Sequence, residues 1–189
     1  NTEFDIKTKS DNSPLTQADL TSHKIIEKGL KKLSPEIPII SEEQGLTEFN
    51  IRKKWKRYWL IDPLDGTKEF VKKNGEFTVN IALIEENKPI FGVVHGPVIE
   101  KTYVGCIGIG SFIINADGKE KKIHIASKSS KPIKVVGSRS HRGNSLDALE
   151  NKLGKLNILP MGSSLKFCIV AEGRADIYPR LGPTSEWDT

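Results

Sequence analysis

The stretch that decides the fold is residues 59–67, with the sequence WLIDPLDGT. Its first three residues are large and apolar, which is typical of a buried strand. Pro63 fixes its own φ and biases Asp62 towards an extended backbone, so the strand ends in a sharp turn. Asp62 and Asp65 stand three residues apart across this turn. Their carboxylates can therefore converge on one point at the end of a buried strand.

This turn combines groups that suit a cation and a phosphate. Two ionised carboxylates at such close range repel each other unless a cation neutralises them, and oxygen ligands select hard cations such as Mg²⁺, Ca²⁺ or Mn²⁺. Gly66 permits close backbone approach, and the amides of Gly66 and Thr67 point out of a turn or helix start, where phosphate oxygens are readily bound. The segment favours a shared metal and phosphate loop. An ordinary Asp-capped turn is the simpler alternative.

Around this segment the pattern predicts an α+β domain. Apolar residues recur at helical spacing between Thr16 and Leu33, and Thr16 with Asp19 is typical of a capping pair at a helix start. Alternating apolar residues and polar turns then predict an antiparallel meander. Its strands are expected at residues 78–83, 90–94, 102–104, 111–114 and 123–125.

Beyond residue 128 the pattern changes to alternating strands and helices, which indicates an α/β unit. The expected elements are a strand at 135–136, a helix at 146–153, a strand at 158–159, a helix at 163–172 and a strand at 177–178. We therefore expect two domains. Residues 1–127 would form an α+β domain that binds metal and phosphate, and residues 128–189 an incomplete α/β domain that binds the substrate. Because the chain starts without Met and stops just after Asp188, we also expect a fragment.

The composition fits a globular protein. The 189 residues include 29 basic and 24 acidic side chains, interspersed along the chain, and 37% apolar residues. This composition excludes a fibrous repeat or a disordered chain. No apolar run approaches the roughly 18 residues of a membrane span. Cys106 and Cys168 stand far apart, so we expect two buried apolar fillers in a reducing cytoplasm rather than a disulfide or a zinc site.

The net charge of +5 favours anionic ligands without choosing among them. The densest basic stretch, residues 52–57, precedes Tyr58 and Trp59 and could track phosphates and stack bases, as in a non-catalytic nucleic-acid-binding module. Because the stretch leads directly into an apolar run, the favoured interpretation is a solvent-exposed charged segment that precedes a buried strand. A nucleic-acid-binding module would also leave the carboxylates unexplained.

Three further acidic groups occupy positions that support a shared site. Glu42 follows an apolar run at residues 37–40, which would hold its carboxylate at the end of a buried segment. Asp19 lies in the first turn of the predicted helix, and Asp188 follows a Gly-Pro break. For Asp19, a helix cap without further role is the alternative.

The order of the motifs SPLTQAD (13–19), SEE (41–43), WLIDPLDGT and WDT (187–189) resembles a known superfamily. This is the lithium-sensitive, magnesium-dependent sugar-phosphatase superfamily, which includes inositol monophosphatases, fructose-1,6-bisphosphatases and 3′(2′),5′-bisphosphate nucleotidases. The segments 68–85, 138–141 (SRSH) and 162–189 are most similar to the bacterial CysQ-type 3′(2′),5′-bisphosphate nucleotidases. The resemblance spans almost the entire chain. It implies a layered αβαβα fold, α+β and α/β in its parts and truncated here at both ends.

The resemblance also implies roles for the acidic residues. The implied ligands of two or three Mg²⁺ ions are Glu42, Asp62, the backbone carbonyl of Leu64, Asp65 and Asp188, with Asp62 bridging two ions. Thr67, oriented by Asp19, would hold the attacking water in line, because a hydroxyl that donates to a carboxylate must accept from the water. The implied catalytic residues are thus Asp19, Glu42, Asp62 and Thr67.

Substrate choice is expected from the second domain. Ser163, Ser164 and Lys166 open a predicted helix whose amino end offers amides and positive charge to a phosphate. Arg180 stands where inositol monophosphatases usually carry a glutamate, and arginine suits a second phosphate. The resemblance places Ser140 and His141 near the non-reacting phosphate. It also implies substrate contacts from the metal loop and its ligands, namely Glu42, Leu64, Asp65, Gly66, Thr67 and Asp188.

The activity implied is that of a phosphoric monoester hydrolase. Such an enzyme removes the 3′-phosphate of adenosine 3′,5′-bisphosphate, giving AMP and phosphate, and in the family recycles a by-product of sulfate activation. An inositol-phosphate or other sugar-phosphate phosphatase is the alternative, disfavoured by Arg180. The expected partner is a small nucleotide bisphosphate and not a nucleic-acid polymer. The expected location is the cytoplasm, with room for a weak peripheral association with the inner membrane, and the oligomeric state stays open.

Overall fold

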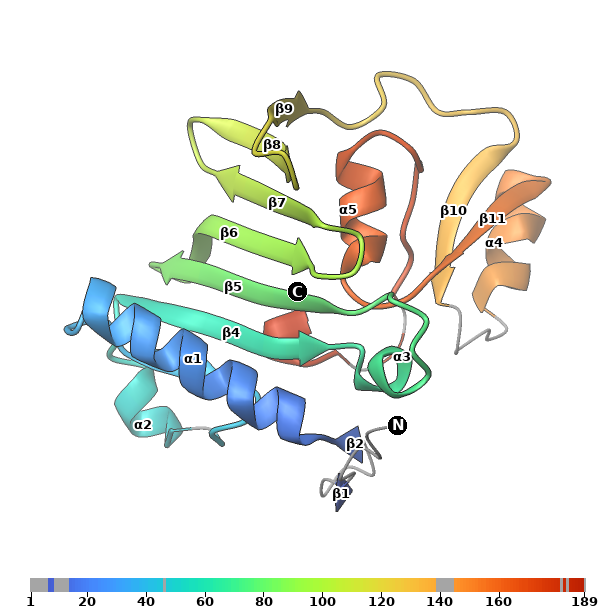
Figure 1. Ribbon diagram of the computed structural model, residues 1–189. Helices are drawn as coiled ribbons and strands as arrows, with labels where there is room; N and C mark the ends of the chain where they lie inside the picture. The colour runs from blue at the N-terminus through green and yellow to red at the C-terminus, as the bar shows by residue number, and fades with distance from the viewer. Residues whose placement is uncertain are drawn as a thin grey trace.

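The computed structural model describes residues 7–8, 14–45, 47–138, 145–180, 182 and 184–188. The substrate contacts expected for Ser140 and His141 lie outside these residues. Within them the chain forms two main sheets with helices beside and between them (Figure 1).

The larger sheet has seven strands in the order β3-β4-β5-β6-β7-β8-β9. All neighbours in it are antiparallel except β3 and β4, which are parallel. The strands are β3 (Ile39–Ser41), β4 (Arg57–Asp65), β5 (Thr78–Glu85), β6 (Lys88–Gly96), β7 (Lys101–Cys106), β8 (Gly110–Asn115) and β9 (Glu120–Ile123). The predicted hairpin and meander are confirmed, because adjacent polar turns join strands of alternating pattern. The last strand was predicted at 123–125, which was wrong for residues 124 and 125, because the pairing with β8 covers residues 120–123.

Helix α1 (Gln17–Leu33) covers one face of this sheet along β4 (Figure 1). A capping box between Thr16 and Asp19 begins it, as predicted. The α1 residue Leu30 packs against Trp59 and Ile61, whose side chains point to the same face because strand residues alternate. This face holds one of the main hydrophobic cores.

The opposite face of the sheet receives α5 (Leu165–Ala171) and the short 3₁₀-helix η1 (Glu186–Asp188). Leu165 and Cys168 of α5 pack against Tyr103 and Ile113 of the sheet. Trp187 of η1 packs on the cluster around Leu60, the neighbour of Trp59 that faces the other way. Even-numbered residues of β4, Asp62 among them, therefore point towards η1 and not towards α1.

A smaller parallel sheet completes the layers. It consists of β10 (Ile133–Ser138) and β11 (Leu156–Met161), joined by α4 (Ser145–Leu153) on their outer side (Figure 1). Ile169 on the far side of α5 packs against Val136 of β10, so α5 lies between the two sheets. The resulting order of helix, sheet, helix, sheet and helix confirms the expected αβαβα layering.

Several elements differ from the sequence expectations. The helix expected at 163–172 begins only at Leu165, and the strand expected at 177–178 is reduced to one bridge between Ile177 and Val135. Cys106 is half-buried where a buried residue was expected; that part of the prediction was wrong, because Cys106 is the last residue of β7 and precedes an exposed turn, whereas Cys168 is buried. Short elements that the sequence did not indicate are β1 (Lys7–Thr8), β2 (Pro14–Leu15), α2 (Phe49–Arg52) and α3 (Thr67–Val71). In the described part of the chain no helix combines the length and apolarity needed to cross a bilayer.

Candidate active site

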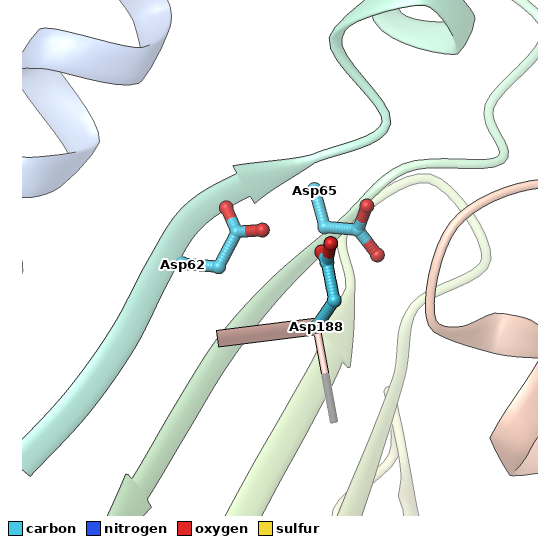
Figure 2. Close-up of side chains that lie close together, drawn as sticks. All are labelled: Asp62, Asp65 and Asp188. Atoms are coloured by element: carbon cyan, nitrogen blue, oxygen red, sulfur yellow. The ribbon is translucent and has the colours of Figure 1, made fainter. Parts of the chain in front are cut away.

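A β-bulge at the end of β4 brings the first two carboxylates together. Across β4 and β5, Asp62 pairs with Asn80 and Asp65 with Thr78, so the spacing on β4 exceeds that on β5 by one residue. In a regular strand, residues three positions apart point to opposite faces. The extra residue of the bulge reverses this relation. Both carboxylates therefore lie on the side of the sheet that faces η1 (Figure 2).

Asp188 of η1 completes a cluster of three carboxylates (Figure 2). Asp62, Asp65 and Asp188 each offer one oxygen, and these oxygens all lie within 4.8 Å of one another. Asp62 is only 1% exposed, while the other two are partly exposed. The prediction that the strand ends in a sharp turn at Pro63 was wrong, because β4 continues through the bulge to Asp65. The end of β4 meets a segment more than a hundred residues further along the chain.

The cluster is electrostatically unfavourable when no cation is bound. Burial is the largest cause that raises the pKa of Asp62 well above its usual range, and the charges of Asp65, Glu42 and Asp188 add to it. Burial and the charge of Asp65 likewise raise the pKa of Asp188. These carboxyls resist ionisation together, and a bound cation would remove that resistance.

Glu42 approaches the same cluster from β3. It directly follows Ser41, the last residue of that strand, and its backbone N–H donates to the Ile61 carbonyl at 3.2 Å. Its side chain is in hydrogen-bonding contact with the Asp62 carboxyl. The parallel pairing of β3 with β4 is what places this residue beside Asp62, as expected for a carboxylate at the end of a buried segment.

Asp19 makes the contacts that both interpretations of the sequence require, one set with Thr16 and one with Thr67. Its Oδ2 accepts hydrogen bonds from the Thr16 amide at 2.7 Å and from the Thr16 hydroxyl at 2.6 Å, which is the helix cap. Its Oδ1 accepts from the Thr67 hydroxyl at 3.3 Å. The Asp19 side chain is fully buried. The Thr67 proton is therefore directed to Asp19, and the oxygen of Thr67 keeps lone pairs for another donor.

The turn between β4 and α3 requires glycine at position 66. Gly66 has a φ of +92°, in the left-handed region that side chains rarely adopt. A Cβ there would stand 3.2 Å from both the Glu76 carbonyl oxygen and the Ser163 Cβ. The backbone of Gly66 therefore lies against the loop that precedes α5.

Asp65 links the end of β4 to the loop that precedes α5. Its Oδ2 accepts from the Ser163 hydroxyl at 2.7 Å and from the Ser164 amide at 2.5 Å. Thr78 on β5 is fully buried, and its hydroxyl lies 2.6 Å from the Ser163 Oγ and 2.7 Å from the Ser164 Oγ. The Ser164 amide, expected to face a phosphate, is thus engaged by Asp65. Ser164 also donates to Asn80, at 2.9 Å.

Beside the carboxylates lies a cavity of about 320 Å³ with basic and aromatic walls. It is lined by Asp65, Ser163, Ser164, Lys166, Phe167, Tyr178, Arg180, Thr184 and Asp188. Lys166 is 9% exposed, and burial is the main cause that lowers the pKa of its ammonium group. Phe167 and Tyr178 pack edge to face with ring centroids 4.9 Å apart. One cavity therefore joins acidic oxygens to two basic side chains.

The basic stretch at residues 52–57 contributes ion pairs within the protein. Arg52 forms an ion pair with Glu186 of η1 at 2.8 Å, and Arg57 forms one with Glu85 on the neighbouring strand. Trp55 packs in the same cluster as Trp187. Arg52 thereby helps to hold the 3₁₀-helix that carries Asp188. These contacts favour the structural interpretation of the stretch over a nucleic-acid-binding surface.

Sequence reasoning missed the residues that connect these groups. Thr78 and Asn80 support Asp65 through two serines, and Arg52 reaches η1 over 134 residues of sequence. Polar residues at alternate positions of an otherwise apolar strand were the available sign for Thr78 and Asn80. No local pattern indicates the partner of Arg52.

Comparison with known proteins agrees with this arrangement of layers. Residues 1–189 match the profile of the inositol monophosphatase family over their whole length, and the chain belongs to that family.

The similar proteins include several bacterial enzymes of one type. The chain is 50% identical over 181 residues to the 3′(2′),5′-bisphosphate nucleotidase CysQ of Salmonella typhimurium, covering 96% of this chain and 72% of that protein. It is 49% identical over 186 residues to the CysQ nucleotidase of Escherichia coli K12, covering 98% and 74%. The crystal structure of CysQ from Bacteroides thetaiotaomicron superposes with a TM-score of 0.82 at 38% identity, covering 95% of this chain and 72% of that one.

Proposed function

We propose that this protein is a 3′(2′),5′-bisphosphate nucleotidase that hydrolyses adenosine 3′,5′-bisphosphate to AMP and phosphate with Mg²⁺. The observation that carries the proposal is the juxtaposition of Asp62, Asp65 and Asp188 with Lys166 and Arg180 around one cavity. A phosphomonoester with a second phosphate needs this combination. Its reacting end requires divalent cations, and its other end requires fixed positive side chains.

The donor set fits Mg²⁺. All the side-chain donors are carboxylate oxygens, which hard divalent cations prefer. Burial, and then the neighbouring carboxylates, raise the pKa values of Asp62 and Asp188, and a bound cation would offset both effects. Glu42, Asp62, Asp65, Asp188 and the Leu64 carbonyl would hold two or three ions. When bound, these ions would neutralise the phosphoryl oxygens, favour ionisation of water and stabilise the departing oxygen.

Thr67 and Asp19 would orient the attacking water. The Thr67 hydroxyl donates its proton to Asp19, so its oxygen can only accept from the water. This fixes the direction of the water lone pair that attacks phosphorus. Asp19 is held by Thr16 through its other oxygen, so it acts on the water by orienting Thr67.

Lys166 and Arg180 would bind the phosphate that does not react. Both line the cavity next to the carboxylates, and arginine offers paired N–H donors that match phosphate oxygens. A glutamate at position 180 would repel that phosphate. This difference favours a bisphosphate over an inositol monophosphate as substrate.

The remaining assignments follow the same proposal. The division near residue 128 would separate the metal-binding part from the substrate-binding part, with Asp65 and Ser163 as the contact between them. Ser163, Ser164, Gly66, Ser140 and His141 remain proposed substrate contacts. The expected partner is a small nucleotide bisphosphate, and cytoplasmic location with weak peripheral membrane association stays a prediction.

The test is phosphate release from three substrates. Purified chain is incubated with adenosine 3′,5′-bisphosphate, inositol 1-phosphate or fructose 1,6-bisphosphate, with Mg²⁺ or with EDTA. We expect the nucleotide to be preferred and EDTA to stop turnover. A preference for either sugar phosphate would refute the nucleotide assignment and favour the family's other activity.

Matched variants distinguish the loss of a carboxylate in the cluster from the loss of an acidic side chain elsewhere. Asp62→Asn removes the most buried carboxylate of the cluster and should abolish turnover while the fold is kept. Asp117→Asn is the control, because Asp117 lies in the turn after β8 and pairs with Lys119, far along the sheet from the cluster. Equal turnover by the two variants would contradict the site.

A further inference from the structure

We propose that His23 is a positioning residue for Glu42, acting through Ser41 on the turn that carries the Glu42 carboxylate. The proposal rests on the proposed function only in taking Glu42 as a metal ligand. His23 lies on α1, and its side chain faces the end of β3. It makes no contact with the carboxylate cluster among the interactions that the structure describes.

The contact between His23 and Ser41 is buried. The His23 Nδ1 lies 2.9 Å from the Ser41 Oγ; His23 is 9% exposed and Ser41 is fully buried. Other contacts from this face of α1 to the sheet are the apolar packing of Ile26 and Leu30 and a hydrogen bond from the Ser22 hydroxyl to the Pro63 carbonyl at 2.8 Å. A buried polar pair is destabilising unless each partner satisfies the other, so its bond constrains geometry in a way that apolar packing does not.

The direction of the hydrogen bonds follows from the neighbours of the ring. The His23 Nε2 lies 3.9 Å from the Glu27 Oε2, and a carboxylate on that side favours the tautomer with its proton on Nε2. The Nδ1 then accepts from the Ser41 hydroxyl. Ser41 in turn accepts from the Glu43 amide at 3.3 Å with a lone pair of its oxygen. The relay runs from Glu27 through His23 and Ser41 to the backbone of Glu43.

This relay fixes the turn on both sides of Glu42. The Ser41 carbonyl accepts from the Gln44 amide at 3.2 Å, and the Gln44 side chain donates to Glu27 at 3.4 Å. Residues 41 and 44 are thus both tied to α1. Glu42 lies between them, with its side chain in contact with Asp62. Small rotations of the turn would move a ligand oxygen by more than metal coordination tolerates.

The loss of His23 would free the Ser41 hydroxyl to rotate. That hydroxyl would then seek another acceptor, and the Glu43 amide would lose its fixed partner. The helix and the sheet would still pack through Ile26 and Leu30. The expected defect is therefore in metal affinity, with the fold retained.

The experiment measures Mn²⁺ binding to the full chain by isothermal titration calorimetry, with the metal alone. We expect His23→Leu to weaken Mn²⁺ binding about tenfold, the range seen when a partner of a metal ligand is removed. His23→Asn, whose amide oxygen can replace Nδ1 as an acceptor, should bind within about threefold of wild type if the acceptor is what matters. Thr21→Val is the control, since Thr21 lies on the exposed face of α1 and bonds only within the helix.

Ser41→Ala tests the same relay from its other end. It should weaken Mn²⁺ binding as much as His23→Leu, and the double variant should be no weaker than either, because both act through one bond. If His23→Leu proves unfolded by circular dichroism, Ser41→Ala decides. Wild-type affinity in His23→Leu or Ser41→Ala, or additive losses in the double variant, would overturn the proposal. Wild-type chain that binds Mn²⁺ but releases no phosphate would count against the proposed function alone.

Discussion

Replacing Thr78 by valine should destabilise the protein where the larger sheet contacts the loop that precedes α5. Valine has nearly the same shape but no hydroxyl, and Thr78 is fully buried between Ser163 and Ser164. Because Ser163 donates to Asp65 and Ser164 donates to Asn80, Thr78 can donate its single proton to only one of the two serines, and the substitution removes that hydrogen bond. Because Ser163 and Ser164 hold the Asp65 carboxylate, the change should also disturb the carboxylate cluster.

The size of the effect follows from what each serine keeps. A buried polar group that loses a partner costs about 1–3 kcal/mol, and the lower end applies because Ser163 still donates to Asp65 and Ser164 to Asn80. One such loss gives about 1 kcal/mol. In a chain of this length each kcal/mol lowers the Tm by about 2–4 °C, so the expected decrease is about 2–4 °C.

The assay is thermal denaturation in EDTA, followed by Mn²⁺ titration of the folded chain. Thr78→Ser keeps the hydroxyl and should retain most of the metal affinity. Thr102→Val is the matched control, because the Thr102 hydroxyl also hydrogen-bonds one side chain, the partly buried His95 Nδ1 at 2.9 Å, but on β7. A Tm for Thr78→Val within about 1 °C of wild type would refute the reasoning on the two serines.

Three more outcomes are expected. Burial, and then the charges of Asp65, Glu42 and Asp188, raise the pKa of Asp62, so metal-free wild type should lose stability as the pH rises through that pKa. Asp62→Asn should lose less stability over the same pH range, because only the raised pKa of Asp188 remains, as melting curves in EDTA from acidic to neutral pH would show. Arg52→Ala should lower stability by less than about 1 kcal/mol, since the ion pair is partly exposed, yet weaken Mn²⁺ binding by loosening η1, whereas Arg57→Ala should leave binding unchanged. Lys166→Ala and Arg180→Ala should raise the KM for adenosine 3′,5′-bisphosphate more than for 3′-AMP; an equal change would contradict their role at the second phosphate.

The strands and the first helix could be predicted because their causes are local. Alternating apolar residues specify β5 and β6, the intervening polar turn pairs them, and Thr16 with Asp19 begins α1. The start of α5 and the strand at residue 177 were less well predicted. The reason is that only one bridge, to Val135, supports that strand in the described residues.

The carboxylates of the candidate site could be recognised in the sequence, but their arrangement in space could not be predicted from it. The carboxylates were recognisable from WLIDPLDGT and from the resemblance, yet residues at positions 62 and 65 of a regular strand would point apart. The bulge that turns them to one side depends on pairing with β5. Likewise, the serines that hold Asp65 come from 98 and 99 residues away, a separation that no local pattern encodes.

The arrangement implies that metal binding by the carboxylate cluster and packing of α5 against the larger sheet support each other. In the metal-free chain, burial of Asp62 beside other carboxylates opposes folding, while hydrogen bonds from Ser163 and Ser164 hold Asp65 in place. A cation that binds only the assembled cluster would stabilise the folded chain, by about 2.7 kcal/mol at a hundred times its dissociation constant. Loss of the serine contacts should then reduce metal affinity, and removal of metal should loosen the docking of α5. Hydrogen exchange at Cys168 and Ile169 with and without Mg²⁺ would measure this coupling, and identical protection in both states would exclude it.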